Sequence, residues 1–241
     1  LLSFLIGWLF GFGYFISNLY WITNSLTFEE IFKPLIPFAF LLVPAFLGIF
    51  YGLATLSCSF FELNKNYSSL LIFSLMLSIV EFIRGTILSG FPWNLIAYSW
   101  VNYNDFLQIL AFIGTYAFNL LSITLFLVPS IIFFNSSLKS KSIFIFSSIL
   151  LVLINFYYGQ FVKNKYAKLE SIELNTTIKV ISPKVKIDRF FEDEDPLILI
   201  EELIELSNPS DENAIFVFPE GILSNIFLED IQIYKKTFND S

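Results

Sequence analysis

Five long apolar segments constrain the fold of this chain more than any other feature of its sequence. They cover roughly residues 1–23, 35–61, 68–88, 106–134 and 141–158. A helix needs about 20 residues to cross the hydrocarbon core of a bilayer. Because lipid offers no partner for a free backbone N–H or C=O, such segments must be helical. The sequence therefore predicts a transmembrane helical domain of about five spans over residues 1–160.

The charged residues are distributed unevenly along the chain. Residues 1–158 carry five basic and five acidic side chains, whereas residues 159–241 carry nine basic and sixteen acidic ones. This asymmetry predicts lipid around the first part and water around the second. A net acidic second part also lacks the basic face that nucleic-acid binding requires, so we expect no nucleic-acid partner.

The counts of histidine and cysteine exclude several kinds of site. The chain has no histidine, and its one cysteine, Cys58, lies within an apolar segment. Histidine acid–base catalysis, histidine-ligated metals, cysteine metal clusters and an intrachain disulfide are therefore excluded within these residues. The chain begins at Leu1 rather than methionine and stops in a polar stretch at Ser241. We expect it to be a piece of a longer protein.

The residues after 160 predict the start of an α/β domain. Residues 177–181 alternate polar and apolar, as a short strand does, and the apolar run 214–218 is typical of a fully buried strand. Between them, Asp195 and Pro196 predict a helix start. One side of that helix, which ends near Ser207, would carry Ile200, Leu203, Ile204 and Leu206. Strand, helix and strand in this order predict a β-α-β unit with a parallel strand pair.

A single carboxylate, Glu220, follows the second predicted strand by way of Phe218 and Pro219. In open α/β sheets, catalytic groups gather at the carboxyl ends of strands. Glu220 is therefore a candidate catalytic residue, and the alternative is a carboxylate that caps a helix or turn. The acidic run at 192–195 is interpreted as a solvated loop.

Glu81 and Arg84 form an ionisable pair one helical turn apart near the end of the third apolar segment. Ionisable groups at membrane depth are costly, which makes the pair a functional candidate. The alternative is an arginine that extends to the interface and is tied to its neighbour across one turn. The apolar loop at 91–93 could dip into the lipid surface or simply anchor the spans. Asn119, in the fourth segment, predicts an interhelical hydrogen bond.

Charge does not settle the orientation of the chain in the membrane. Lysines flank the last apolar segment on both sides, at positions 139 and 141 before it and at 163, 165 and 168 after it. The positive-inside rule therefore does not separate the two orientations.

Taken together, these motifs resemble the bacterial apolipoprotein N-acyltransferase family. The membrane part of the resemblance is carried, in the family's order and spacing, by Gly11-Phe12-Gly13-Tyr14-Phe15, Tyr20-Trp21-Ile22, Glu81-Phe82-Ile83-Arg84-Gly85, Gly90-Phe91-Pro92-Trp93 and Tyr98-Ser99. In the second part, Val180-Ile181-Ser182-Pro183 is similar to the first strand of the family's nitrilase-like domain. Phe218-Pro219-Glu220 is similar to its Trp-Pro-Glu segment. The implied fold is a membrane all-α bundle followed by the start of an α/β domain, a nitrilase-like α-β-β-α sandwich, over residues 161–241.

The resemblance implies an integral membrane enzyme of the carbon–nitrogen hydrolase type, with a Glu-Lys-Cys triad and no metal or cofactor. The cysteine thiolate would take an acyl chain from a phospholipid, and the acyl group would pass to the N-terminal amino group of a diacylglyceryl-cysteine lipoprotein. The implied partners are a phospholipid acyl donor, a diacylglyceryl apolipoprotein acceptor and the membrane itself. The implied location is the bacterial inner membrane, multi-pass, with the soluble domain in the periplasm.

The family's residue roles carry over only where this sequence matches its motifs. Glu220 matches the family's glutamate, whose implied role is general base. Phe190 takes the place of a family tryptophan and keeps an apolar contact for lipid or peptide. The remaining implied assignments are substrate binding by Phe91, Pro92 and Trp93, and a structural or gating role for Glu81 and Arg84.

Other features depart from the family or leave alternatives open. Lys235 and Lys236 follow the Pro-Glu segment too closely to match the family's lysine, and Cys58 lies in an apolar segment. We therefore expect the triad's lysine and cysteine beyond residue 241. Phe218 also replaces the family's tryptophan before Pro-Glu.

Two other functions are left open by the residues. One is a transporter with a polar path along Glu81, Arg84 and Asn119. The other is a non-catalytic membrane scaffold whose soluble part binds partners.

Overall fold

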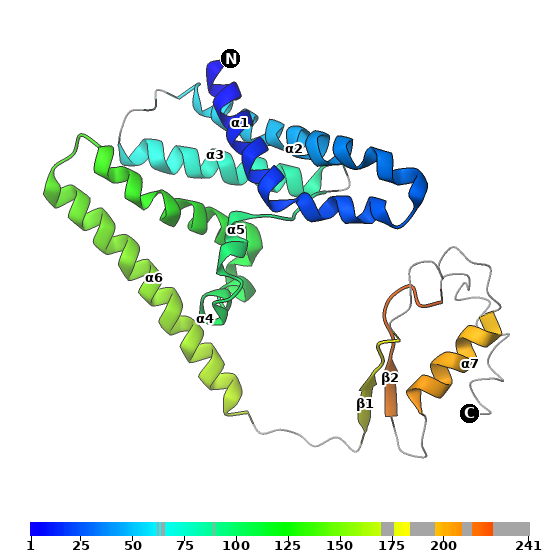
Figure 1. Ribbon diagram of the computed structural model, residues 1–241. Coiled ribbons are helices and arrows are strands. Elements are labelled where there is room, and N and C mark those ends of the chain that lie inside the picture. The colour runs from blue at the N-terminus through cyan, green and yellow to red at the C-terminus, as the bar shows by residue number, and fades with distance from the viewer. Residues whose placement is uncertain are drawn as a thin grey trace. The chain divides into compact units, whose positions relative to one another are not determined.

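The computed structural model describes residues 1–61, 63, 66–88, 90–169, 176–183, 196–208 and 214–223. The chain divides into two compact units, Leu1–Leu169 and Glu170–Ser241. The described part of the first unit is helical, and that of the second holds two strands and one helix (Figure 1).

The helices of the first unit follow the predicted apolar segments. In chain order they are α1 (Leu2–Asn18), η1 (Tyr20–Thr27), η2 (Glu30–Leu35), α2 (Ile36–Cys58), α3 (Tyr67–Thr86), η3 (Ile96–Trp100), α4 (Asn104–Leu107), α5 (Leu110–Leu127), η4 (Val128–Phe133) and α6 (Leu138–Ala167), where η marks a 3₁₀ helix. Four stretches are long and apolar enough to cross a membrane: Glu30–Cys58, Tyr67–Thr86, Leu110–Phe133 and Leu138–Ala167. They correspond to the last four predicted spans.

The first predicted span is a bent pair rather than one straight helix. The axes of α1 and η1 differ by 52°. Leu19 leaves the helical conformation between them, with φ −115° and ψ 11°. Beyond this point the hydroxyls of Thr23, Ser25 and Thr27 each donate to a carbonyl three residues earlier. Such local side-chain bonds compete with a regular α-helix, which explains the bend.

α1 lies directly against α2 because small residues of α1 face it. A Cβ atom added at Gly7 would come within 2.5 Å of the Tyr51 carbonyl oxygen, and one at Gly11 within 3.0 Å of Gly48 Cα. Without a hydrophobic driving force between helices in lipid, close van der Waals packing of this kind holds membrane helices together.

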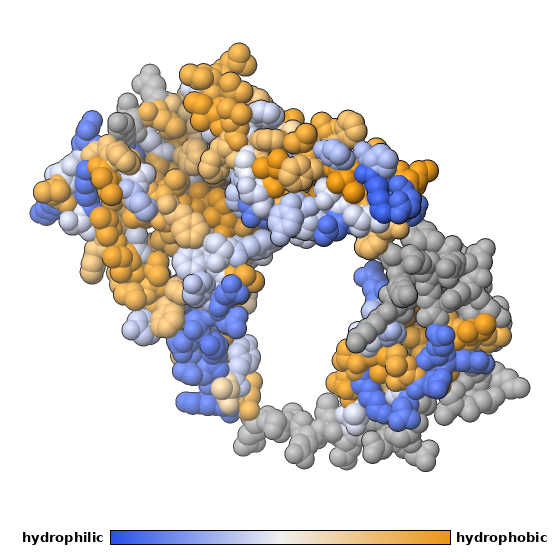
Figure 2. Space-filling view, viewed as in Figure 1, coloured by the Kyte–Doolittle hydropathy of each residue, from blue (hydrophilic) through white to orange (hydrophobic). Residues whose placement is uncertain are grey.

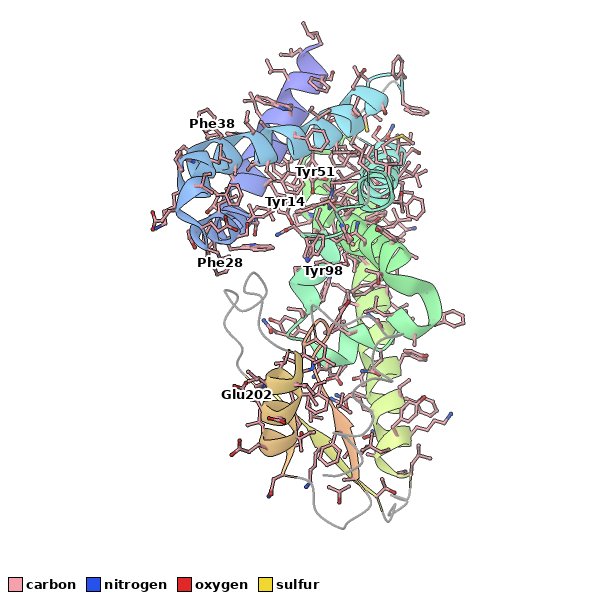
Figure 3. The ribbon with its side chains drawn as sticks, turned by 90° about the vertical axis from the view of Figure 1, so that its right-hand side faces the viewer. Tyr14, Phe28, Phe38, Tyr51, Tyr98 and Glu202 are labelled. Carbon is pink, nitrogen blue, oxygen red and sulfur yellow. The ribbon has the colours of Figure 1, made fainter. Side chains whose placement is uncertain are left out.

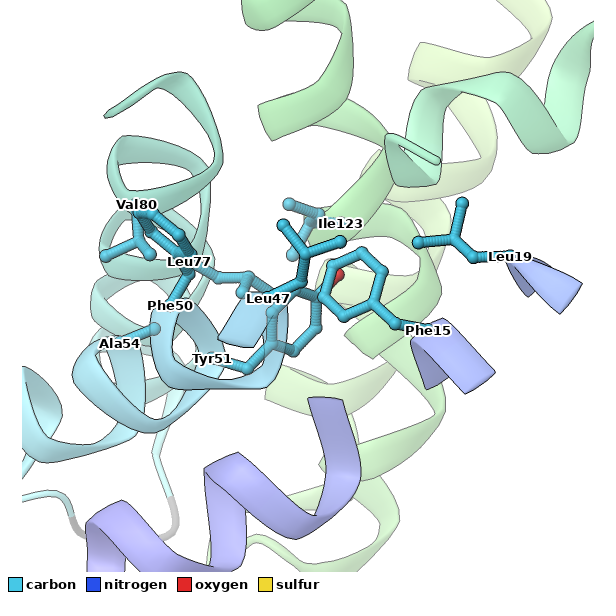
Figure 4. Packing of buried hydrophobic residues seen from close by; sticks show 9 residues of the cluster. All are labelled: Phe15, Leu19, Leu47, Phe50, Tyr51, Ala54, Leu77, Val80 and Ile123. Carbon is cyan, nitrogen blue, oxygen red and sulfur yellow. The ribbon is translucent and has the colours of Figure 1, made fainter. Parts of the chain in front are cut away.

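The core of the first unit gathers buried side chains from α1, α2, α3 and α5 (Figure 4). Its members are Phe15, Leu19, Leu47, Phe50, Tyr51, Ala54, Leu77, Val80 and Ile123. Many large apolar side chains outside it are exposed, among them Phe38 at 61% and Phe112 at 83%. Figure 2 shows hydrophobic residues over much of the visible face of these helices. An apolar outer surface is what lipid-facing helices require.

α6 is longer than the span predicted at 141–158, since it begins at Leu138 and continues to Ala167. Ser137 caps its start by accepting a hydrogen bond from the Ser140 N–H at 3.2 Å. The C-terminal half of α6 packs against α4, where hydrophilic residues gather (Figure 2). Lys163 forms an ion pair with Asp105 at 2.7 Å, and the Gln160 side chain donates to the other carboxylate oxygen at 2.8 Å.

The second unit contains the predicted β-α-β arrangement, with β1 (Thr177–Val180), α7 (Pro196–Ser207) and β2 (Ala214–Val217). The strands pair in parallel, with Ile178 opposite Ile215 and Val180 opposite Val217. This pairing confirms the predicted parallel strand pair. Asp195 and the acidic run at 192–195 lie outside the described residues.

Two details of the second unit differ from the prediction. The strand at 214–218 was expected to be fully buried, but Ile215 is 54% exposed and β2 ends at Val217. Its alternate side chains share an exposed sheet face with Ile178 and Val180, so only the opposite face is covered. On α7, Leu206 is exposed and Leu199 is buried in its stead, because the buried stripe is centred on Ile200 and Leu203.

Candidate functional site

α3 places two ionisable side chains inside the helical unit. Glu81 is fully buried and Arg84 is 1% exposed. Their i, i+3 spacing puts both on one face of the helix. The ion pairs among the described residues are Lys33–Glu30 and Lys163–Asp105, so Glu81 and Arg84 do not form one. The tie between Arg84 and Glu81 that the alternative predicted is therefore wrong.

Glu81 is held by two neighbouring helices. The Tyr51 hydroxyl of α2 donates to one carboxylate oxygen at 2.8 Å, and the Asn119 amide of α5 donates to the other. The Asn119 side-chain oxygen accepts the backbone N–H of Ala97 at 2.9 Å. Asn119 is fully buried. These contacts confirm the interhelical hydrogen bond predicted for Asn119, and they extend it to the start of η3.

Arg84 binds the backbone of the loop that follows α3. Its Nη1 donates to the carbonyl oxygens of Phe91 at 2.6 Å and Trp93 at 2.9 Å. The guanidinium also lies over the rings of Phe15 and Phe91, at 5.2 and 5.9 Å from their centroids, which is a favourable cation–π arrangement. Among the described residues, its Nε and Nη2 have no hydrogen-bond partner. Arg84 thus folds the loop back against the end of α3.

Gly90 allows the turn that brings this loop back. Its φ of +78° lies in the left-handed region that favours glycine. A Cβ atom at this position would lie 2.4 Å from the Gly85 carbonyl oxygen. The Phe91 N–H then donates to the Arg84 carbonyl oxygen at 2.9 Å.

A cleft of about 590 Å³ opens beside the loop. It lies between the C-terminal end of α1, the start of η1 and the loop, and its lining residues are Tyr14, Asn18, Trp21, Trp93, Asn94, Leu95, Ile96, Tyr98 and Ser99. The Tyr14 hydroxyl donates to the Asn94 carbonyl oxygen at 3.0 Å. Trp93 is 52% exposed and lines the cleft, whereas Phe91 and Pro92 are half-buried.

The cleft combines aromatic rings with polar groups. Trp21 and Tyr98 are each 44% exposed. Partial burial raises the pKa of Tyr98, so its phenol remains a neutral donor at ordinary pH. Figure 3 labels Tyr51, Tyr14 and Tyr98, which follow one another down the view. An aromatic and polar lining of this kind suits an amphipathic ligand with an apolar chain and a polar head.

Glu220 belongs to the second unit. It lies in a turn shortly after β2, at the carboxyl end of the parallel strand pair, and it is exposed. Gly221 follows it with φ +72°. Phe190 lies outside the described residues. The structure thus brings Glu81, Arg84 and the loop at 91–93 together in the first unit, and it places Glu220 in the other.

Sequence reasoning missed the two tyrosines of this site. Tyr51 donates to Glu81, and Tyr14 donates to the loop. The signal that could have found them is a hydroxyl in the middle of an apolar span, since a buried tyrosine O–H usually finds a partner. Among the described residues, no three acidic or cysteine side chains lie close enough together to hold a metal ion.

Comparison with known proteins identifies relatives of this chain. The domain described as "Apolipoprotein N-acyltransferase N-terminal domain" matches residues 2–128. A protein of Allorhizobium ampelinum named apolipoprotein N-acyltransferase is 27% identical over 234 residues, which are 95% of this chain and 43% of that protein. Proteins of the same name from Brucella melitensis and Rhizobium meliloti are 35% identical over 133 residues and 26% identical over 231 residues. These two alignments cover 55% and 93% of this chain, and 25% and 43% of the relatives. The chain spans less than half the length of the curated relatives it matches.

Proposed function

Because this chain belongs to the apolipoprotein N-acyltransferase family, we propose that it acts in transferring an acyl chain from a phospholipid to a lipoprotein. The acceptor is the N-terminal amino group of a diacylglyceryl-cysteine. The observation that carries this proposal is the family match over residues 2–128, which includes α1 to α5 and the whole loop beside the cleft. The alignment with the Allorhizobium relative extends the similarity into the second unit.

The proposed reaction has two steps. A cysteine thiolate attacks the ester carbonyl of the phospholipid, the ester C–O bond breaks, and a thioester and a lysophospholipid form. The acceptor amine then attacks the thioester, an amide C–N bond forms, and the thiol is released. A lysine N–H stabilises the oxyanion of each tetrahedral intermediate. Cys58 is not this nucleophile, because it is 3% exposed at the end of a candidate membrane span.

In this proposal Glu220 is the general base, which takes the thiol proton and later returns a proton to the leaving group. Its place at the carboxyl end of a parallel strand pair supports the role, since catalytic groups of α/β sheets gather there. Residues 161–241 would be the N-terminal part of a nitrilase-like domain, with Phe190 as an apolar contact for substrate. Residues 1–160 would be the transmembrane domain.

The cleft of the first unit is the proposed entry for the acyl donor. Phe91, Pro92 and Trp93 would bind the lipid. Of these, Trp93 lines the cleft and is exposed, and tryptophan rings favour the membrane interface. Polar groups of the same cleft, such as Asn18 and Ser99, suit the ester and head-group region. Glu81 and Arg84 have a structural role in this proposal, because they hold the loop through hydrogen bonds. Their burial gives the transporter hypothesis no support, since a transport path requires access to solvent.

The proposed location is the bacterial inner membrane, with several spans and with the second unit in the periplasm. This location supplies both substrates, because the phospholipid and the lipid-anchored acceptor share one bilayer.

The test uses the full-length protein in liposomes that contain a phospholipid with a labelled acyl chain. We expect a hydroxylamine-sensitive label on the protein, and a loss of its formation rate of about 100-fold or more in Glu220→Gln. The matched control is Glu205→Gln, an exposed carboxylate of α7, which should react as the wild type does. Thioester formation at the wild-type rate by Glu220→Gln would remove the base role. A wild-type protein that forms no thioester would favour the scaffold hypothesis instead.

A further inference from the structure

Residues 90–97, here called the cleft loop, run from Gly90 into the first turn of η3 and are held by side chains from three other helices. Tyr14 of α1 donates to the Asn94 carbonyl oxygen at 3.0 Å. Arg84 of α3 donates to the carbonyl oxygens of Phe91 and Trp93. Asn119 of α5 accepts the N–H of Ala97 at 2.9 Å. The loop therefore depends on distant parts of the chain for its position.

The orientation of the Asn119 amide is fixed by the backbone of η3. The Ala97 N–H can only donate, so the Asn119 oxygen must face it. The Asn119 NH₂ group then faces Glu81. The Tyr51 hydroxyl donates to the other Glu81 oxygen and holds the carboxylate in place. The bonds of Tyr51, Asn119 and Ala97 each join a donor to an acceptor, so together they favour one position for the end of the cleft loop.

The cleft loop presents the Trp93 side chain at the cleft. Trp93 is 52% exposed, and its ring lies 5.1 Å from the Phe91 ring between centroids. Its backbone carbonyl is bound by buried Arg84. The place of the ring is therefore set mainly through the backbone of the loop. A binding group held in place before the ligand arrives costs less ordering entropy on binding.

We propose that Tyr14 and Asn119 are positioning residues, which hold the cleft loop so that the Trp93 ring is in place for the acyl donor. This inference rests on the proposed function, because the acyl donor is the ligand that the ring would meet. Neither residue touches the reacting atoms in this proposal. Their removal should therefore weaken binding of the phospholipid and leave the chemical step intact.

The first test is hydrogen exchange of the full-length protein in nanodiscs, which needs no enzymatic activity. We expect the amides of the cleft loop to exchange about tenfold faster in Asn119→Ala, which is the factor expected for one net hydrogen bond. The matched control is Ser122→Ala, one turn further along α5. Ser122 is fully buried as well, but within the described part of the chain its hydroxyl bonds only to the Phe118 carbonyl of its own helix. This control should leave exchange of the loop unchanged.

Tyr14→Phe tests the same idea if Asn119→Ala does not fold. It removes only the hydroxyl that reaches Asn94 and keeps the ring that stacks on Tyr51 at 5.8 Å. We expect exchange of the cleft loop to rise by about threefold or more, at the lower end of one net hydrogen bond. Exchange at the wild-type rate in Tyr14→Phe would overturn the proposal.

The second test separates positioning from chemistry. In thioester formation, KM for the phospholipid should rise about tenfold in Asn119→Ala, with kcat within about twofold of the wild type. A fall in kcat with an unchanged KM would overturn the positioning role. If the wild type makes no thioester, the proposed function fails by itself, and the exchange measurements still decide whether Tyr14 and Asn119 hold the loop.

Discussion

Replacing Gly159 by alanine should detach α4 from α6. A Cβ atom at this position would lie 1.8 Å from the Asp105 carbonyl oxygen and 2.6 Å from its carbonyl carbon. Real Cβ atoms essentially never approach another heavy atom more closely than 3.0 Å, so the two backbones must separate by about 1.2 Å, the difference between those distances. Neither backbone can absorb this shift by a rotamer change.

The cost of this separation follows from the contacts that it breaks. They are the Lys163–Asp105 ion pair and the hydrogen bonds from Gln160 to Asp105 and from Asn155 to the Phe106 carbonyl. The two hydrogen bonds contribute about 0.5–1.5 kcal/mol each, and the partly exposed ion pair contributes at most about 1 kcal/mol. Alanine has a higher helix propensity than glycine, which offsets about 1 kcal/mol of this loss in stability. The net loss in free energy of unfolding is therefore about 0–3 kcal/mol.

The assay is unfolding of the purified protein in detergent by added SDS, followed by circular dichroism. The matched control is Gly13→Ala, since the Cβ position of this α1 glycine has no described atom within 4 Å apart from its own helix and chain neighbours. Gly13→Ala should stabilise the protein by up to about 1 kcal/mol. If Gly159→Ala were as stable as Gly13→Ala, the close contact between α4 and α6 would be refuted.

Three further predictions concern the proposed activity and the cleft. Cys58→Ser should form the thioester at a rate within about twofold of the wild type, because the proposed nucleophile is a cysteine other than buried Cys58; loss of the labelled thioester in this variant would reassign the nucleophile. Trp93→Ala should raise KM for the phospholipid about tenfold, the order expected for loss of an aromatic contact, and an unchanged KM in the same assay would remove the ring from the binding site. Burial raises the pKa of Tyr98. The ultraviolet difference titration between the wild type and Tyr98→Phe should therefore show a phenol that ionises above its usual range. A transition at or below about pH 10 would contradict the raised pKa.

Much of the helical fold could be predicted from the length of the apolar segments. α2, α3, α5 and α6 each lie within or across a predicted span, because backbone groups in lipid have no alternative to a helix. The parallel strand pair was also predictable, since alternating and helical periodicities follow one another in the second unit. The bend at Leu19 was not, because it depends on which of two local bonding patterns the polar residues after it adopt.

The candidate site was only partly visible in the sequence. Glu81, Arg84 and the loop at 91–93 stand out locally, since charge and an apolar loop are unusual at their positions. Their partners come from positions far away in the chain: Tyr51 contacts Glu81 across 30 residues, and Tyr14 contacts Asn94 across 80. The spacing of apolar residues along the chain does not indicate such contacts, because the contacts depend on how α1, α2 and α5 pack. The role of Glu220 remains a prediction.

The most direct measurement of the central claim is the mass and the acylated atom of a product. The full-length protein is incubated in liposomes with a synthetic diacylglyceryl-cysteine peptide and a phospholipid that carries one isotope-labelled acyl chain. We predict that the peptide gains the mass of that labelled chain and that fragmentation places it on the α-amino group of the cysteine. A peptide of unchanged mass, or label recovered only as free fatty acid, would contradict the proposed N-acyltransferase function.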